Sequence, residues 1–287
     1  MVITTGFFDG VHLGHRYVID SLVKAAKERG TESCVVTFWP HPRTVLQDGA
    51  RELRLLSSFQ EKKDILLGLG VDRVEVVDFN REFSRLTAEE YLRDYVKDRF
   101  NGEAILLGYD NRMGSDCLSH EKIVKTAESL SLEVIQVERF GAGSWTRPVS
   151  STLIRMALGT GDVVNAAEML GRRYSIVGEV VPGNQVGRTI GFPTANIRIQ
   201  DTMKLVPLEG AYFVEVLIGN ETYFGMCNVA ARIEVHIFDF DGQIYGKELK
   251  ISFVRRIRNE IEINSLSLLK EQLEKDEALC RQWISLI

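Results

Sequence analysis

The first half of the chain alternates short apolar runs with longer segments of helical periodicity. Strands are predicted at residues 33–38, 73–79, 103–108 and 132–138, and helices at 16–29, 59–69, 87–99 and 118–130. Strands that alternate with helices pair in parallel, so this half is predicted to be an α/β domain. In the first helix Val18, Leu22 and Ala26 share one face, and Gly30 is expected to end it.

The second half changes to closely spaced strands with turn residues between them. Strands are predicted at 174–181, 211–218, 222–229, 233–240 and 248–254, followed by a helix at 265–284. This spacing is typical of a small barrel or sandwich. A helical segment at about 151–171 joins the halves, and we expect domains at 1–157 and 158–287.

Length, charge and cysteine content narrow the class of protein. The 287 residues fit two domains, and 45% hydrophobic residues suffice for folded cores. A net charge of −5, without a basic half, argues against nucleic acid as the main partner. Four scattered cysteines suggest neither a disulfide framework nor a zinc site. With no apolar run of membrane length and no signal-like start, we expect a cytoplasmic protein without a membrane partner.

The first candidate site is the opening segment TTGFFDGVHLGHR, which lies between a predicted strand and the first helix. It contains Gly6, Gly10 and Gly14, and the two histidines His12 and His15. Glycines allow phosphate to approach the backbone, the helix N-terminus favours anions, and two imidazoles can donate hydrogen bonds to phosphate. The alternatives are a glycine turn with structural histidines and, less favoured, a zinc site.

Three further segments lie at predicted strand ends or open a helix. They are TFWPHP (37–42), GYDNRMG (108–114) and VSSTLIR (149–155). Ligands of open α/β sheets bind at the carboxyl ends of the strands. Ser151 and Thr152 are expected to cap a helix and bind phosphate, with Arg155 as a planar cation; ordinary helix capping is the alternative.

A second candidate site lies at 178–197, where a glycine-rich stretch precedes the tetrapeptide PTAN. Gly183, Gly187 and Gly191 are expected to expose backbone N–H groups to phosphate, although the stretch lacks the GK[ST] of a P-loop. A plain turn is the alternative.

Taken in order, these motifs resemble the bacterial bifunctional riboflavin kinase/FAD synthetase family over essentially the whole chain. The transferase motifs of that family are GxFDGVHxGH, TFxPHP, a GxDFxFG-like segment and ISSTxIR. The resemblance implies a nucleotidyltransferase fold that joins FMN to the AMP part of ATP and releases pyrophosphate. It implies that His12 and His15 contact ATP phosphates and that Asp110 contacts the adenosine side. Phe8 and Asp9 match the first motif, and Ser151, Thr152 and Arg155 are expected to hold the triphosphate.

The same resemblance makes the second half a riboflavin kinase on an antiparallel β-barrel with a C-terminal helix. Thr194 and Asn196 of PTAN offer neutral oxygens suited to Mg²⁺, and Glu234 is the expected general base for the ribityl hydroxyl. His236, on the same strand face, is expected to pack. The remaining expected contacts to nucleotide or flavin are Gly183, Gly187, Arg188, Gly191, Pro193 and Asn228.

Two departures from the family pattern stand out. Asn111 and Met113 replace an aromatic or histidine and a phenylalanine, and Glu234 follows Asn228 by only six residues where the family has a longer loop. Such a loop can close over flavin or nucleotide. The expected function is riboflavin to FMN to FAD with ATP and Mg²⁺. The alternatives are a single-activity nucleotidyltransferase and a flavin-binding protein without turnover.

Overall fold

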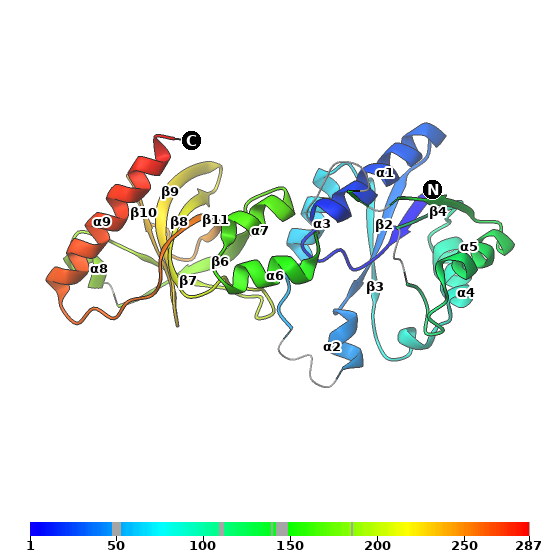
Figure 1. The fold of residues 1–287 in the computed structure, drawn as a ribbon, viewed down its shortest axis with the longest axis horizontal. Coiled ribbons are helices and arrows are strands. Elements are labelled where there is room, and N and C mark those ends of the chain that lie inside the picture. Colours follow the sequence, from blue (N-terminus) through cyan, green and yellow to red (C-terminus); the bar gives the residue numbers. More distant parts are fainter. Residues whose placement is uncertain (48–52, 109–111, 139, 142–148, 185, 287) are drawn as a thin grey trace. The chain divides into compact units, whose positions relative to one another are not determined.

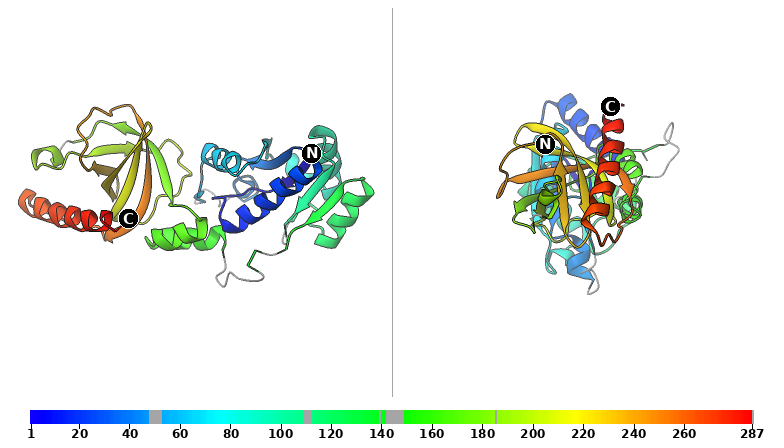
Figure 2. Two further views of the ribbon diagram at one scale, coloured as in Figure 1. Left: turned by 90° about the horizontal axis from the view of Figure 1, so that it is seen from above. Right: turned by 90° about the vertical axis from the view of Figure 1, so that its left-hand side faces the viewer.

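The computed structural model describes residues 1–47, 53–108, 112–138, 140–141, 149–184 and 186–286. The chain divides into two compact units, Met1–Ser150 and Ser151–Ile287, which are drawn in Figures 1 and 2. No helix in these described ranges is long and apolar enough to cross a membrane.

The first unit is built on a five-stranded parallel sheet in the order β3-β2-β1-β4-β5. Its strands are β1 (Val2–Thr5), β2 (Ser33–Trp39), β3 (Arg73–Asp78), β4 (Ala104–Leu107) and β5 (Glu133–Gln136). The chain builds outward from β1 on one side and then crosses to β4 on the other. The strand order therefore reverses between β1 and β4, the position at which open α/β sheets bind ligands.

Helices cover both faces of this sheet. They are α1 (Leu13–Arg29), α2 (Pro42–Leu46), α3 (Phe59–Gly68), α4 (Ala88–Glu90) continuing as η3 (Tyr91–Arg99), and α5 (His120–Ser129), with a short η2 turn (Phe83–Arg85). Val2 packs in the cluster with α1 and α3, whereas Ile3 packs with η3 and α5. Alternate residues of β1 thus pack in two cores, which explains why the strand is buried on both faces. Gly30 ends α1 in the left-handed conformation, as the sequence predicts.

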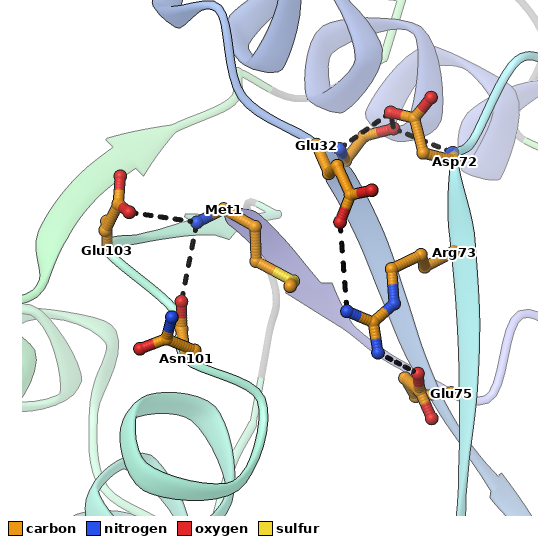
Figure 3. A network of polar contacts seen from close by, with 8 residues as sticks. Met1, Glu32, Asp72, Arg73, Glu75, Asn101 and Glu103 are labelled. Atoms are coloured by element: carbon orange, nitrogen blue, oxygen red, sulfur yellow. Dashed lines mark hydrogen bonds and ion pairs between the residues drawn. The ribbon is translucent and has the colours of Figure 1, made fainter.

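Polar contacts tie neighbouring strands together at their amino ends (Figure 3). Asp72 accepts hydrogen bonds from the backbone N–H and hydroxyl of Ser33 at 2.8 and 2.7 Å, and Arg73 of β3 pairs with Glu32, just before β2, at 3.8 Å. The Met1 ammonium donates to a backbone carbonyl on the loop before β4. These contacts hold the strands in register at the amino-end edge of the sheet. The loop that follows β1 lies at the carboxyl-end edge.

The second unit is a closed barrel of six antiparallel strands in the order β10-β7-β6-β11-β8-β9. The strands are β6 (Ser175–Val181), β7 (Ala195–Arg198), β8 (Gly210–Ile218), β9 (Glu221–Val229), β10 (Ile233–Ile237) and β11 (Glu248–Arg258). This confirms the predicted fold class. The sequence missed β7, because its four residues follow a glycine-rich stretch that reads as loop.

Helices complete the second unit. They are α6 (Ser151–Gly159), α7 (Val163–Leu170), the single turn α8 (Val186–Thr189) and α9 (Leu266–Ile284). The expected single helix at 151–171 is thus two helices, broken at Gly161, which has a φ of +78°. Cys280 of α9 packs in one cluster with Phe213 and Met226 of the barrel, and Arg258 binds Asp276 of α9 at 2.8 Å.

Candidate active sites

The loop Gly6–His12 leaves β1 at the point where the strand order reverses and enters α1. It is tightly wound, since Phe8, Gly10 and Val11 all have positive φ values of 53°, 76° and 39°. Gly6 follows the strand, and Gly14 lies in the first turn of α1. A loop forced into left-handed conformations outside glycine needs support from its surroundings.

That support comes from residues just before α3. The buried Asp9 carboxylate accepts the backbone N–H groups of Leu56 at 3.0 Å and Ser57 at 3.3 Å. The Ser57 hydroxyl accepts the N–H of Gly10 at 3.1 Å. Asp9 is therefore an anchor of the loop, and its expected ligand contact stays a prediction.

His12 and His15 are brought together by the start of α1. Their rings stack with centroids 3.6 Å apart, and Phe8 packs edge-on against His15. His12 is the N-cap, and its Nδ1 accepts the backbone N–H of His15 at 3.3 Å. Because Nδ1 accepts, the proton of a neutral His12 lies on Nε2, which can donate to an anion.

His15 is held in its neutral form. Burial, the neighbouring His12 and the charge of Lys62 together lower its pKa well below the ordinary value of 6.5. Its Nδ1 is buried without a hydrogen-bond partner among the residues that the structure describes. His15 is thus a neutral imidazole, and His12 presents its Nε2 as a hydrogen-bond donor beside it.

Sequence reasoning missed Lys62, which lies directly beneath this loop. Its side chain is only 1% exposed, and Nζ donates to the Phe7 carbonyl at 2.9 Å and to Thr37 Oγ1 at 3.0 Å. A signal existed in the sequence, because Lys62 lies on the apolar face of α3 with Phe59 and Leu66.

The other predicted transferase residues lie on segments away from the Gly6–His12 loop in sequence. Asp110, like Asn111, lies outside the described residues. Ser151 and Thr152 are the first two residues of α6, so the helix begins at them instead of being capped by them. They and Arg155 belong to the second compact unit, and their contact with ATP remains a prediction. In TFWPHP, His41 caps α2 through Nδ1 and packs on the ring of Phe7 at 4.1 Å.

On the barrel, strand register aligns three candidate residues. Glu234 of β10 pairs with Asn196 of β7 on one side and with Asn228 of β9 on the other. Directly paired residues project to the same face of a sheet with Cβ atoms about 4.5–5.5 Å apart. We call Asn196, Glu234 and Asn228 the polar row; it places a carboxylate between two amides.

The polar row has unsatisfied oxygens. Oδ1 of Asn196 and Oδ1 of Asn228 are both buried without a hydrogen-bond partner in the described part of the chain. Gly183 closes over Asn196, since a Cβ at Gly183 would lie 1.9 Å from Asn196 Nδ2. Buried polar oxygens normally have partners, so a ligand that supplies positive charge fits here. Mg²⁺, which prefers oxygen ligands, suits this donor set.

The glycine-rich stretch is more ordered than the sequence suggested. Gly187 and Arg188 belong to α8, and the carbonyl of Gly187 accepts the N–H of Phe192 at 2.8 Å. Gly191, with a φ of +89°, ends this turn. Part of the stretch that was expected to be an open phosphate-binding loop is therefore a closed turn. The N–H groups that close this turn are bonded to backbone carbonyls.

Arg188, Pro193 and Thr194 line one cavity of about 470 Å³, together with the segment 240–245. Asn196 lines a separate cavity of about 580 Å³ beside the β9–β10 turn. The two proposed metal ligands therefore border different hollows of the same barrel wall.

The short link between Asn228 and Glu234 is a regular hairpin. Val229 pairs with Ile233, and Ala230 N–H donates to the Arg232 carbonyl at 3.1 Å. The longer loop of the family pattern is thus replaced by a tight turn. His236 packs, as expected, between Phe192 and Phe238, and its Nδ1 lies 2.8 Å from the Pro193 carbonyl oxygen.

Comparison with known proteins identifies a family for each half of the chain. The FAD synthetase family matches residues 1–153, and the riboflavin kinase family matches residues 170–284. A solved structure described as a macrolide-efflux protein from Streptococcus pneumoniae is 33% identical with a TM-score of 0.89. The structural match covers 98% of this chain and 94% of the Streptococcus pneumoniae chain.

Two curated relatives are bifunctional riboflavin kinase/FMN adenylyltransferases. The one from Listeria monocytogenes is 36% identical, covering 96% of this chain and 90% of the relative. The one from Escherichia coli K12 is 32% identical, covering 99% of this chain and 93% of the relative. With both domain families matched and near full-length similarity, this chain belongs to the bifunctional riboflavin kinase/FMN adenylyltransferase family.

Proposed function

We propose that this chain makes FAD in two steps at two separate sites, each using ATP. The barrel phosphorylates riboflavin to FMN, and the α/β unit transfers AMP to FMN with release of pyrophosphate. The observation that carries the proposal is the presence of two chemically different sites on two folds. One offers two stacked imidazoles as hydrogen-bond donors at a strand-order reversal, and the other a carboxylate between two amides.

In adenylyl transfer, an oxygen of the FMN phosphate attacks the α-phosphorus of ATP, and pyrophosphate leaves. The nucleophile is already anionic near neutral pH, so the site has to position it and stabilise charge, without a general base. His12 donates from Nε2 to phosphate oxygens, and the N-terminus of α1 adds its dipole. Ser151, Thr152 and Arg155 are proposed to hold the triphosphate, and Asp110 the adenosine side.

In riboflavin phosphorylation, the ribityl 5′-hydroxyl must lose a proton as it attacks the γ-phosphorus. Glu234 is proposed to take this proton, because the polar row holds its carboxylate on the same face as Asn196 and Asn228. Asn196, whose Oδ1 has no partner among the described residues, would hold Mg²⁺, which neutralises developing charge on the phosphates when bound. Thr194, which lines the neighbouring cavity, remains the predicted second ligand. Arg188 lies in the cavity wall beside Thr194, where a cation suits a phosphate.

We place the division of labour at the predicted limits, 1–157 for adenylyl transfer and 158–287 for the kinase. The family matches, which end at 153 and begin at 170, leave the joining segment between them. The reducing cytoplasm remains the proposed compartment on the basis of four cysteines without disulfide spacing.

Product analysis by chromatography tests the proposal. Riboflavin with ATP and Mg²⁺ should give FMN and then FAD, and FMN supplied in place of riboflavin should give FAD directly. FAD from FMN but no FMN from riboflavin would indicate a single-activity transferase. Flavin binding without either product would indicate a binding protein and would overturn the proposal.

A further inference from the structure

A single stretch of chain, residues 56–62, makes several hydrogen bonds to the Gly6–His12 loop. Leu56 and Ser57 hold Asp9 and Gly10 on one flank of the loop. Lys62 holds the Phe7 carbonyl on the other flank at 2.9 Å. Three residues of the loop, Phe7, Asp9 and Gly10, are thus hydrogen-bonded to one short segment, in which Lys62 is the cation.

Lys62 makes three contacts that meet at Phe7. Nζ donates to the Phe7 carbonyl and to Thr37 Oγ1, and it lies 3.9 Å from the centre of the Phe7 ring. The Thr37 hydroxyl also donates to the Phe7 carbonyl at 3.2 Å. The loop after β1, the strand β2 and the helix α3 are therefore joined at one ammonium group. Moving an ammonium group from water into the protein interior costs free energy. A lysine buried at this position is therefore expected to have a function that offsets this cost.

We propose that Lys62 is a positioning residue for adenylyl transfer, which fixes the histidine-bearing loop through Phe7 and adds positive charge behind the phosphate site. This inference rests on the proposed adenylyl transfer at that loop. Lys62 does not need to touch a substrate, because its hydrogen bonds already set the path of the backbone that carries His12 into α1.

The charges around Lys62 are consistent with this role. Asp9 of the loop attracts the ammonium, whereas burial disfavours it more strongly, and the net result lowers the pKa of Lys62 to about 8. His15 of α1 faces the same region, and the charge of Lys62 helps to lower the His15 pKa. His41 lies on the ring of Phe7. Lys62 is thus charged at neutral pH while the nearby His15 stays neutral.

The test compares Lys62→Met, Lys62→Arg and Lys63→Met, the last a matched change on the same helix. FAD formation from FMN and riboflavin phosphorylation are measured on each whole protein. We expect Lys62→Met to lower kcat/KM for FAD formation by about 10- to 100-fold. Riboflavin phosphorylation should stay unchanged in every variant, Lys62→Arg should recover a large part of the lost rate, and Lys63→Met should behave as wild type.

Two readouts separate positioning from a merely structural role. In the wild type, FAD formation should fall as the pH rises past about 8 and Lys62 loses its proton, and Lys62→Arg should remove this fall. In an NMR titration, Lys62→Met should raise the pKa of His15, because a neighbouring positive charge is gone. If Lys62→Met does not fold, Thr37→Val removes one partner of Nζ and should give a smaller loss of FAD formation.

The outcomes are distinct from failure of the proposed function. If wild-type protein forms no FAD from FMN, the proposed function fails. If the wild type forms FAD and Lys62→Met forms it equally fast with the same pH profile, the role of Lys62 is overturned. If Lys62→Met loses both activities because it unfolds, Thr37→Val decides, and an unchanged rate of FAD formation in that variant overturns the role of Lys62.

Discussion

The Gly6–His12 loop is held by the protein's own hydrogen bonds, whereas the polar row on the barrel leaves two buried amide oxygens without partners in the described structure. In the loop, Asp9 and Lys62 use their charges on backbone groups. In the polar row, the charge of Glu234 faces only neutral amides in its register.

This difference matches the chemistry proposed for each half. Adenylyl transfer begins from an anionic nucleophile and needs precise donors, so its loop is fixed in advance. Riboflavin phosphorylation needs a proton acceptor and a metal ion, so its donor atoms stay available to a ligand. We infer that the first site depends on backbone geometry and the second on individual side-chain oxygens.

Glu234→Gln gives the largest expected effect. Loss of the proton acceptor should lower kcat for riboflavin phosphorylation by about 10²- to 10⁴-fold. FAD formation from supplied FMN should remain at the wild-type rate. Glu248→Gln on the exposed part of β11 is the matched control and should leave both rates unchanged. Equal loss of both rates in Glu234→Gln would show that the two sites are not independent.

His12→Ala is the reciprocal test on the loop. Removing the Nε2 donor should lower FAD formation by about 10²- to 10³-fold and spare the kinase. Because His12 also caps α1, alanine should cost about 1 kcal/mol of stability as well. His12→Asn keeps a capping oxygen but loses the imidazole donor, so it should lose activity with less loss of stability. An active His12→Asn enzyme would contradict the donor role.

Gly183→Ala tests the polar row without removing a charge. The new Cβ would lie 1.9 Å from Asn196 Nδ2, so the amide has to turn away from its present position. We expect riboflavin phosphorylation to fall by about tenfold or more, since a displacement of about 1 Å can cost up to 10²-fold in rate. Gly159→Ala, which has open space around it, is the control and should leave the kinase unchanged.

The two regions also differ in how far sequence predicts them. The fold of the α/β half could be predicted from hydrophobic periodicity and turn residues. The position of His12 and His15 at the start of α1 could be predicted from their motif. The contacts that support the loop could not be predicted in this way. Leu56, Ser57 and Lys62 contact the loop from about 47 to 55 positions away in sequence, and single-sequence patterns carry no such pairing.

On the barrel, the motif indicated Asn196 and Glu234, but their adjacency depends on β7, which the sequence did not reveal. A strand of four residues after a glycine-rich stretch has too little periodicity to detect. The register that puts Glu234 opposite Asn228 is fixed by the tight turn at Ala230–Arg232, whereas its pairing with Asn196 is a long-range contact between β10 and β7. The sequence showed that this link is short, and the structure shows that the short link forms a tight hairpin turn.

The smallest expected effect is a pH dependence of stability in the first unit. Burial, His12 and Lys62 lower the pKa of folded His15 well below 6.5, the value expected in the unfolded chain. Below pH 6.5 the unfolded state therefore binds more protons, and the stability of this unit should fall as the pH decreases; above that value His15 contributes no slope. Hydrogen exchange of peptides from α1, measured between pH 5 and 7.5 in roughly half-unit steps, reports this unit separately. His15→Gln should remove the slope, and a variant that keeps it would assign the effect to another group.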